Sequence, residues 1–349
     1  MRITRWVVVV LVLLWAGLGP HPADNSHYRD SDYHRSTLES LAKASLLRET
    51  GTLHIGVAQT DISPSPGQPL AGYGKRKPMG SEGLESPCYA RALTLSVNGK
   101  AVTVLTADLL LVTDDLVDEV LQRTGLKHRD LYFTASHTHS GPGGYGERIV
   151  EEMAFGDYDQ GYFNRLASQL ADVVTESRRK LQPAEFAVVS REASGIQFNR
   201  IKSGSPTHDQ IYALLFRAVD GPESRSPLAL LSVFGSHATL LTRKNRRTSP
   251  DYPGYLVDKL KRETGAGMVM FAAGTVGDAS SVRPHGKSEF DQARIYGERL
   301  ADELMAELPQ AHYQREVTLA ALSVPVQLPK RRLSLSADWT LGPLLTPLI

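Results

Sequence analysis

From residue 51 onward, short apolar runs rich in β-branched residues alternate with longer amphipathic stretches. Such alternation of buried strands with helices is typical of an α/β layer architecture. The apolar runs predict strands at 101–107, 131–135, 186–190, 211–218, 228–234 and 268–272. We therefore expect a mixed β-sheet core flanked by α-helices.

A 3.6-residue repeat of apolar positions predicts helices over 162–181, 255–263 and 292–307. A further helix is expected to begin after Thr113, because threonine is a good N-cap. Asp114 and Asp115 follow in the first turn, where acidic side chains interact favourably with the helix dipole. The helix over 292–307 should end before Pro309, since proline cannot continue it.

Four of the predicted strands run into a polar residue that can do chemistry. These residues are Asp108, His137, His237 and Asp278. In open α/β sheets the binding crevice lies beyond the carboxyl ends of the strands. The four side chains are therefore expected to converge if their strands are parallel neighbours.

The first 23 residues have the layout of a secretory signal peptide: two arginines, an apolar run over 6–18, and then Gly-Pro-His-Pro-Ala. The run is shorter than the ~20 residues of a spanning helix, and the cleavage pattern is poor. We favour a cleaved signal over an uncleaved anchor, and expect an exported protein, periplasmic or secreted, with membrane anchoring as the alternative. Residues 24–50 are polar and are interpreted as a tether to a domain over 51–349.

The composition is that of a globular protein with a large core: 41% of residues are hydrophobic and 22% are charged. Lys and Arg (39) nearly balance Asp and Glu (38), so a nucleic-acid partner is not expected. The single cysteine, Cys88, excludes an intrachain disulfide and is expected to be a buried apolar residue. His, Asp, Glu and Tyr remain as candidate metal ligands.

The string His137-Thr138-His139 lies at a strand end and is followed by the glycine-rich segment 140–144. A loop with so few side chains, Gly141 included, lets backbone approach a ligand closely. Neutral imidazole is the commonest metal ligand in proteins. We favour a functional site here over the alternative, a structural turn that carries surface histidines.

Two other patterns carry less weight. Residues 141–146 match G-x-G-x-x-G, but 147–160 are polar and interrupted by glycine instead of forming the required helix. No nucleotide cofactor is expected. The basic cluster at 243–247 can attract anionic lipid head groups at a membrane surface, although a solvated loop is the favoured interpretation.

Ordered short motifs from about residue 56 to 284 resemble the neutral, non-lysosomal ceramidase family, in its N-terminal catalytic domain. The motifs are Gly56-Val57-Ala58, Asp61-Ile62-Ser63-Pro64, Gly72-Tyr73-Gly74, Tyr89-Ala90-Arg91-Ala92-Leu93, Ala107-Asp108-Leu109, the 137–142 string, Asn199-Arg200, His237-Ala238-Thr239, Asp251-Tyr252-Pro253-Gly254 and Gly277-Asp278-Ala279-Ser280. Agreement of many motifs in order is far more specific than any one of them.

The resemblance implies that His137 and His237 bind Zn²⁺ and that His139 hydrogen-bonds the substrate or the oxyanion. It also implies a zinc-activated water that attacks the amide of an N-acyl sphingoid base. Asn199 and Arg200 would line the same cleft, with Arg200 near the developing oxyanion; a plain surface arginine is the alternative.

The carboxylates of Asp251, Asp108 and Asp278 are candidates for a further metal ligand or catalytic group. Each can equally orient a histidine from outside the metal shell or cap a turn.

The chain departs from the family at two places. Ile201 stands where the family has a catalytic serine after Asn-Arg, with Ser203 the nearest serine. No position matches the family's further zinc ligands, a Glu and a Tyr, before the apolar run 341–345. We expect the domain over 51–349 to be incomplete at its C-terminus.

The leading hypothesis is a zinc-dependent amidase that acts on an N-acyl or lipid-like small molecule outside the cytoplasm. One alternative is a truncated or degenerate paralogue that only binds or has no activity. Another is an esterase or a different amidase on the same scaffold, because a fold does not fix its substrate. The oligomeric state is not predicted.

Overall fold

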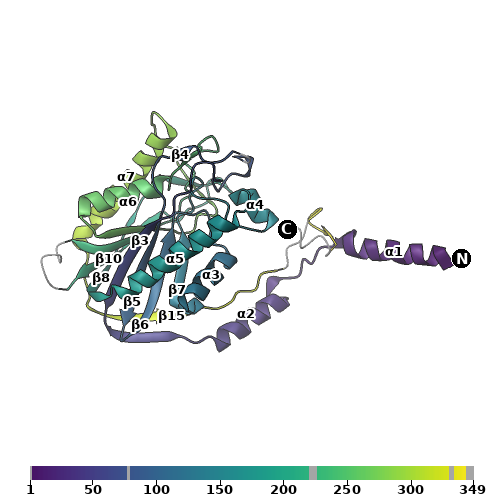
Figure 1. The fold of residues 1–349 in the computed structure, drawn as a ribbon, viewed down its shortest axis with the longest axis horizontal. Coiled ribbons are helices and arrows are strands. Elements are labelled where there is room, and N and C mark those ends of the chain that lie inside the picture. Colours follow the sequence, from purple (N-terminus) through teal and green to yellow (C-terminus); the bar gives the residue numbers. More distant parts are fainter. Residues whose placement is uncertain (1, 77–78, 220–225, 330–333, 343–349) are drawn as a thin grey trace. The chain divides into compact units, whose positions relative to one another are not determined.

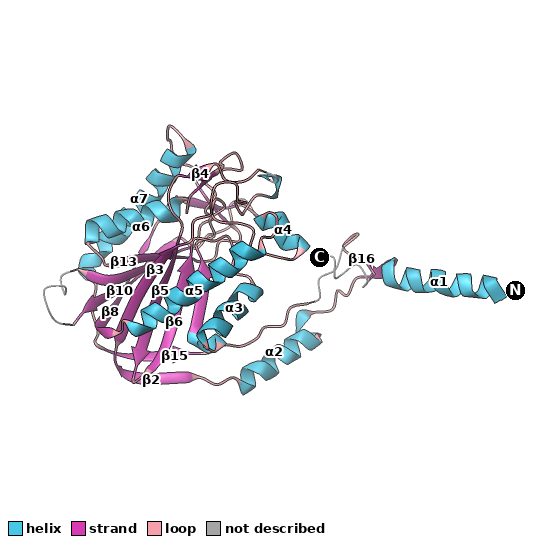
Figure 2. Ribbon diagram, in the orientation of Figure 1, coloured by secondary structure: helices cyan, strands magenta, loops and turns pink. Residues whose placement is uncertain are grey.

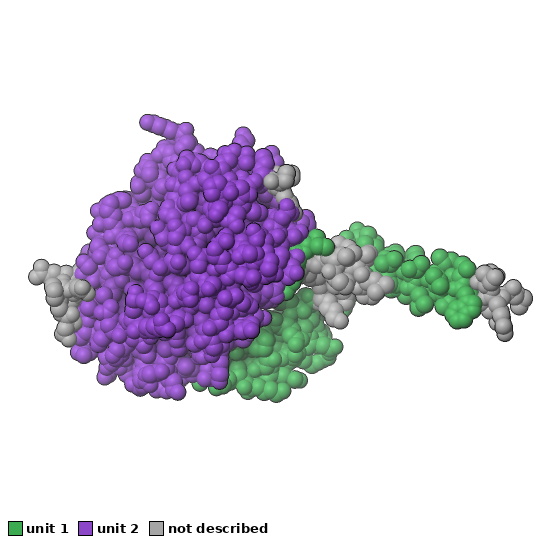
Figure 3. Space-filling model, in the orientation of Figure 1, with its two compact units in different colours: residues 1–46, 148–150, 322–349 green, residues 47–147, 151–321 purple. Residues whose placement is uncertain are grey.

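The computed structural model describes residues 2–76, 79–219, 226–329 and 334–342 (Figure 1). Two compact units are distinguished in Figure 3. One comprises Met1–Leu46, Arg148–Val150 and Leu322–Ile349, and the other comprises Leu47–Glu147 and Glu151–Ala321. Most of the apolar run at 341–345 lies outside the described residues.

The unit that contains the N-terminus is built from few elements. Helix α1 (Arg2–Leu18) covers the predicted signal segment, and β1 (Pro20–Pro22) pairs antiparallel with β16 (Trp339–Leu341). The 3-10 helix η1 (Tyr28–Asp30) precedes α2 (Asp32–Lys43), which is capped by Ser31. In the described part of the chain, every helix is too short or too polar to cross a membrane.

The larger unit contains an eight-stranded mixed sheet in the order β13-β11-β10-β8-β3-β5-β6-β7. The pairs β6–β7 and β11–β13 are parallel and the other neighbours are antiparallel. The strands are β3 (His54–Asp61), β5 (Tyr89–Val97), β6 (Lys100–Ala107), β7 (Leu131–Ala135), β8 (Gln182–Glu192), β10 (Gln210–Ala218), β11 (Pro227–Phe234) and β13 (Met268–Ala273). The expectation of a mixed sheet flanked by helices is confirmed.

The sheet consists of two four-stranded halves that meet at a narrow junction. Strands β3 and β8 pair only at His54 with Pro183 and at Ile55 with Gln182. Side chains from both halves, among them Leu93, Phe216 and Met270, form one apolar cluster, and β13 lies close to β6 and β7. The two halves therefore pack face to face over a common inner core.

Helices cover the outer face of each half (Figure 2). Helices α3 (Asp114–Thr124) and α5 (Gln160–Arg179) pack on the half that ends in β7. Helices α6 (Tyr252–Thr264) and α7 (Glu289–Glu307) pack on the half that ends in β13. The order of layers is therefore helix, sheet, sheet, helix. Successive side chains of a strand point to opposite faces of the sheet, so each half has one face toward the inner core and one toward its helices.

Shorter elements complete the larger unit. The strands β2 (Leu47–Thr52) and β15 (Glu316–Ala321), β4 (Gly83–Leu84) and β12 (Arg247–Thr248), and β9 (Gln197–Asn199) and β14 (Ala279–Ser281) form separate pairs. The remaining helices are η2 (Gly74–Arg76), η3 (His128–Asp130), η5 (Leu308–Gln310) and α4 (Ile149–Phe155), whose residues from Glu151 onward belong to this unit.

The predicted elements agree with the observed ones except at some ends. Thr113 caps α3 by accepting a hydrogen bond from the Leu116 amide, as predicted, and Cys88 is buried. Helix α6 begins three residues before the predicted start, since Asp251 is its N-cap. Helix α5 ends at Arg179, two residues before the predicted end. Strands β3 and β5 were not among the predicted elements.

Candidate metal centre

Three histidines from opposite halves of the sheet come together. His137 and His139 follow β7, and His237 follows β11. The segments beyond these strands are joined by a parallel β-bridge between Thr138 and Ala238, and the His139 amide donates to the Ala238 carbonyl. This bridge brings the imidazoles together, although their strands are not neighbours in the sheet.

The imidazole Nε2 atoms of His137 and His237 are 3.0 Å apart. Their ring centroids are separated by 4.5 Å, and the centroid of His139 is 5.2 Å from each. One ligand atom from each of the three residues lies within 4.8 Å of the others. Among the described residues, this set of three histidines could hold a metal ion.

Each ring is anchored through its other nitrogen to a backbone carbonyl. The Nδ1 atoms of His137, His139 and His237 lie 2.8, 3.0 and 2.6 Å from the carbonyl oxygens of Leu110, Gly72 and Val276. A carbonyl oxygen only accepts, so each Nδ1 carries the proton and each Nε2 of a neutral ring presents a lone pair. Anchoring of the second ring nitrogen in this way is the usual arrangement around metal-binding histidines.

The surroundings keep the three rings neutral. Burial lowers the pKa of His139 to about 3 and that of His237 to about 4. Burial also lowers the pKa of His137. Neutral imidazole is the form that binds metal.

Facing lone pairs favour a cation between the rings. Two nitrogens that bind one tetrahedral zinc at ~2.0–2.1 Å lie roughly 3.3 Å apart, close to the separation of His137 and His237. The Nε2 of His139 is buried without a hydrogen-bond partner in the described structure. The donor set, its tautomers and this orphaned nitrogen fit a zinc-type ion.

The backbone at His137 is in a sparsely populated conformation, with a φ angle of 61°. A non-glycine residue pays of order 1–3 kcal/mol for such a conformation, and these residues cluster at functional sites. Here the conformation turns the chain at the end of β7 so that the ring meets His237.

Gly72 holds the third ring at close range. Its carbonyl accepts from His139, its φ is +106°, and a Cβ there would lie 2.6 Å from the Cα of His139. Because no other residue has room or fits this backbone conformation, Gly72 is required where the loop approaches His139. The sequence indicated this turn only through the Gly72-Tyr73-Gly74 motif.

We expect Gly72→Ala to displace the His139 ring, weaken zinc binding about ten-fold and lower the free energy of unfolding by about 1–3 kcal/mol. Gly67→Ala is the matched control, because Gly67 has a φ of +89° and a Cβ at that position would have no neighbouring atom within 4 Å. Calorimetric zinc titration and urea unfolding measure the two effects. Equal zinc affinity in the two variants would contradict this role of Gly72.

Asp251 lies in a supporting loop. Its carboxylate accepts hydrogen bonds from the amides of Leu241 and Tyr252, 2.9 and 2.6 Å away. It is fully buried, and burial raises its pKa to about 6. The Leu241 carbonyl in turn accepts from the Tyr73 hydroxyl, and the Tyr73 ring lies 5.0 Å from that of His139. Asp251 therefore supports the wall around His139.

Asp108 binds groups other than the histidines. Its carboxylate accepts from the Tyr89 amide and pairs with the Arg91 guanidinium at 3.2 Å. Both side chains of this ion pair are buried. The backbone of Asp108 lies against Gly141, where a Cβ would be 2.6 Å from the Asp108 carbonyl oxygen. Gly141 thus allows the histidine loop to pack on the end of β6.

Asn199, Arg200 and Asp278 lie next to His237. The Asn199 side chain donates to the Asp278 carboxylate at 2.9 Å, and the Arg200 guanidinium donates to the Gly277 carbonyl. Burial is the main cause of the lowered pKa of His137 and of His237, and the charge of Arg200 makes a smaller contribution to each. Of the four polar residues at strand ends, the two histidines meet, whereas Asp278 is bound to Asn199 and Asp108 to Arg91.

Two of the four basic residues in the cluster at 243–247 form ion pairs. Arg246 pairs with Glu82, and Arg247 pairs with Glu85. Asn245 is buried and donates to the Ser140 hydroxyl, directly after His139.

The segment 141–146 is a loop, and the next helix, α4, begins only at Ile149.

Comparison with known proteins places the chain. The family model described as neutral/alkaline non-lysosomal ceramidase, N-terminal, matches residues 53–283. The chain belongs to this family. The resemblance inferred from the sequence motifs is confirmed.

Two curated relatives illustrate the distance within the family. A neutral ceramidase of Mycobacterium tuberculosis is 25% identical over 216 residues, which is 56% of this chain and 33% of that protein. A neutral ceramidase of Pseudomonas aeruginosa is 24% identical over 245 residues, which is 62% of this chain and 36% of that protein. The chain thus spans about a third of the length of these curated relatives.

Solved structures show the same fold. The crystal structure of neutral ceramidase from Pseudomonas aeruginosa matches with a TM-score of 0.67 and 22% identity, covering 76% of this chain and 46% of that one. A structure described as ceramidase complexed with C2 also has a TM-score of 0.67 and 22% identity, with coverages of 76% and 45%.

Proposed function

We propose that this ceramidase-family chain is a zinc-dependent amidohydrolase that cleaves the amide of an N-acyl, lipid-like molecule. The observation that carries the proposal is the convergence of three neutral imidazoles, each with Nδ1 bound to a carbonyl and Nε2 turned inward. Family membership supplies the reaction class.

His137 and His237 form the closest pair of nitrogens and would hold the zinc ion. When bound, zinc polarises a carbonyl and lowers the pKa of water. His139 presents an unprotonated Nε2 beside them, since its Nδ1 proton is engaged by Gly72. A neutral His139 can therefore bind the ion or accept a hydrogen bond from a substrate N–H or hydroxyl, but it cannot donate to an oxyanion.

Arg200 is the positive group suited to an anionic transition state. Its guanidinium is exposed and donates to the Gly277 carbonyl, and two residues further on the Ala279 carbonyl accepts a hydrogen bond from the His237 amide. A fixed charge near a developing oxyanion lowers the barrier of acyl transfer. The residue after Arg200 is Ile201, which is 76% exposed and has no nucleophilic group. We therefore propose water as the nucleophile.

The proposed substrate class follows from the relatives, which are named neutral ceramidases. A ceramide-like N-acyl amino alcohol is the first candidate, and other N-acyl amides are the second. We also propose that residues 1–23 direct export, so that the reaction takes place outside the cytoplasm.

The proposal is tested on the purified full chain. We expect about one equivalent of zinc by metal analysis, and release of fatty acid from an N-acyl sphingosine that stops after chelation and returns with added Zn²⁺. An N-acyl amino acid and a nitrophenyl ester, assayed in parallel, separate the substrate classes. Protein that binds no zinc and cleaves none of the three would refute the proposal, and binding of substrate without turnover would favour the degenerate paralogue.

A further inference from the structure

Arg76, at the end of η2, is a buried arginine. Its exposed fraction is 2%, and within the described residues it forms no ion pair. Burial lowers its pKa to about 10, and the nearby Tyr73 acts in the opposite direction. An unpaired guanidinium is costly to bury, so its position calls for a reason.

The guanidinium bridges two backbone carbonyls at the metal centre. Nη1 donates to the Ala71 carbonyl at 3.2 Å, and Nη2 donates to the His139 carbonyl at 3.0 Å. The same group lies 4.9 Å from the centre of the Tyr73 ring, whose other neighbour is the imidazole of His139. Together with the Gly72 carbonyl, the segment from Ala71 to Arg76 therefore contacts His139 at its ring, its Nδ1 and its backbone.

We propose that Arg76 is a positioning residue of the metal centre, which fixes the orientation of His139 by bridging the carbonyls of Ala71 and His139. This inference rests on the proposed metal-binding function. A planar guanidinium with several donors can hold two carbonyls at once, whereas an ammonium is a single point of charge. No sequence pattern points to this residue, which follows the Gly72-Tyr73-Gly74 motif without belonging to it.

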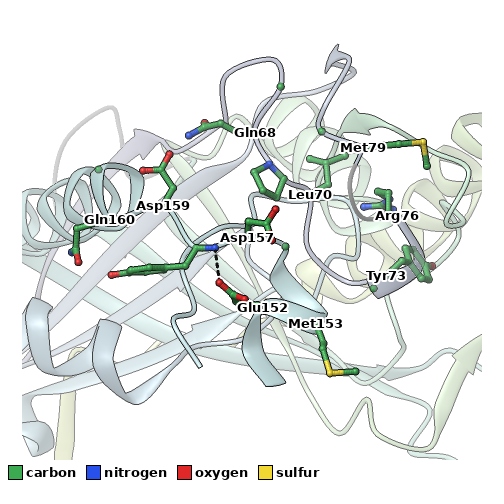
Figure 4. A pocket seen from close by; sticks show the side chains of 17 residues that line it. Gln68, Leu70, Tyr73, Arg76, Met79, Glu152, Met153, Asp157, Asp159 and Gln160 are labelled. Carbon is green, nitrogen blue, oxygen red and sulfur yellow. Dashed lines mark hydrogen bonds between the residues drawn. The ribbon is translucent and has the colours of Figure 1, made fainter. Parts of the chain in front are cut away.

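Arg76 also lines a cavity of about 580 Å³ (Figure 4). Tyr73, Arg76 and Met79 line one end, and Asp159 and Gln160 line the other. A cavity of this size has room for a small cation that diffuses in from solvent. Removal of the Arg76 side chain would therefore leave a space that free guanidinium can reach.

The experiment compares Arg76→Ala, Arg76→Lys and Arg217→Ala in the full chain. Arg217 is the matched control, because its guanidinium also lies over a tyrosine ring, 3.9 Å from the centre of the Tyr313 ring. It differs in that it pairs with Glu185 and belongs to β10, which is not adjacent to β7 in the sheet. We expect R76A to lower the affinity for Co²⁺ by about 10–100-fold and to change the visible absorption of the bound ion. Millimolar guanidinium should restore both in R76A only.

R76K keeps the charge and fills the space, so it should be folded, bind Co²⁺ more weakly than wild type, and show no rescue. Histidine ¹⁵N spectra of the metal-free protein test the same point without any ion: wild type should show His139 protonated at Nδ1, and R76A a mixture of tautomers. The inference would be overturned if R76A had the same ¹⁵N spectra and the same Co²⁺ affinity as the wild type. If R76A does not fold, the same result in R76K would overturn it. A wild-type chain that binds no Co²⁺ refutes the proposed function, while the ¹⁵N spectra still decide the role of Arg76.

Discussion

Replacing His137 or His237 by alanine is expected to abolish zinc binding and hydrolysis together. The two Nε2 atoms are 3.0 Å apart and each ring is held by a carbonyl, so removing either ring destroys the closest pair of nitrogens in the site. We expect bound zinc to fall from about one equivalent to below about a tenth, and turnover to fall by roughly 10³-fold or more, the scale of losing a catalytic metal ion.

His139→Ala should have a smaller effect on zinc content, because the His139 ring lies further from the other two than they lie from each other. His208→Ala is the control: His208 is exposed and stacks on Tyr212 away from the cluster. Metal analysis and assays on the four variants measure this order. Full zinc occupancy in both H137A and H237A would show that the histidines do not bind the ion.

Asp251→Ala is expected to be less stable than Asp251→Gly, the reverse of the usual order of alanine and glycine. Asp251 has φ 61° and ψ −152°, a backbone region that is essentially restricted to glycine. Both variants lose the same two hydrogen bonds to the amides of Leu241 and Tyr252, but only glycine relieves the backbone strain. The free energy of unfolding should differ by about 1–3 kcal/mol, measured in urea.

The pH dependence of stability gives an independent check. The pKa of Asp251 is about 6 in the folded protein, above the ordinary value of 3.8, so the folded state holds this proton more tightly than the unfolded state. Its contribution is therefore fully present below pH 3.8 and is lost as the pH rises through about 6, a change of roughly 3 kcal/mol. The stability curve of D251G should lack this step. If D251A were at least as stable as D251G, the backbone at 251 would not be strained.

Local sequence signals were sufficient for six of the eight strands of the large sheet, for the four helices that cover it and for two candidate site residues. Apolar periodicity located α3 and α5 to α7, and strand ends pointed to His137 and His237. These features depend on neighbours in the chain, which the sequence displays directly. The predicted ends of helices differed from the observed ones where a capping residue sets the end, as Asp251 does at the start of α6.

The assembly of the site could not be predicted, because it depends on contacts between distant segments. The rule of parallel neighbours would have joined Asp108 with His137, yet the face-to-face packing of the half-sheets joins His137 with His237 and leaves Asp108 paired with Arg91. The carbonyls of Gly72, Leu110 and Val276 belong to loops whose approach no periodicity reveals. Arg76 was missed for the same reason.

The narrow junction between β3 and β8 gives the proposed ion a second effect. Two residue pairs join the half-sheets there, whereas His137 and His237 belong to opposite halves and are 100 positions apart in the chain. An ion bound by both rings would act as a cross-link that closes this long loop, and its binding free energy would add to the free energy of unfolding. Resistance to heat would then report zinc supply, and a cell short of zinc would lose the folded protein along with its activity.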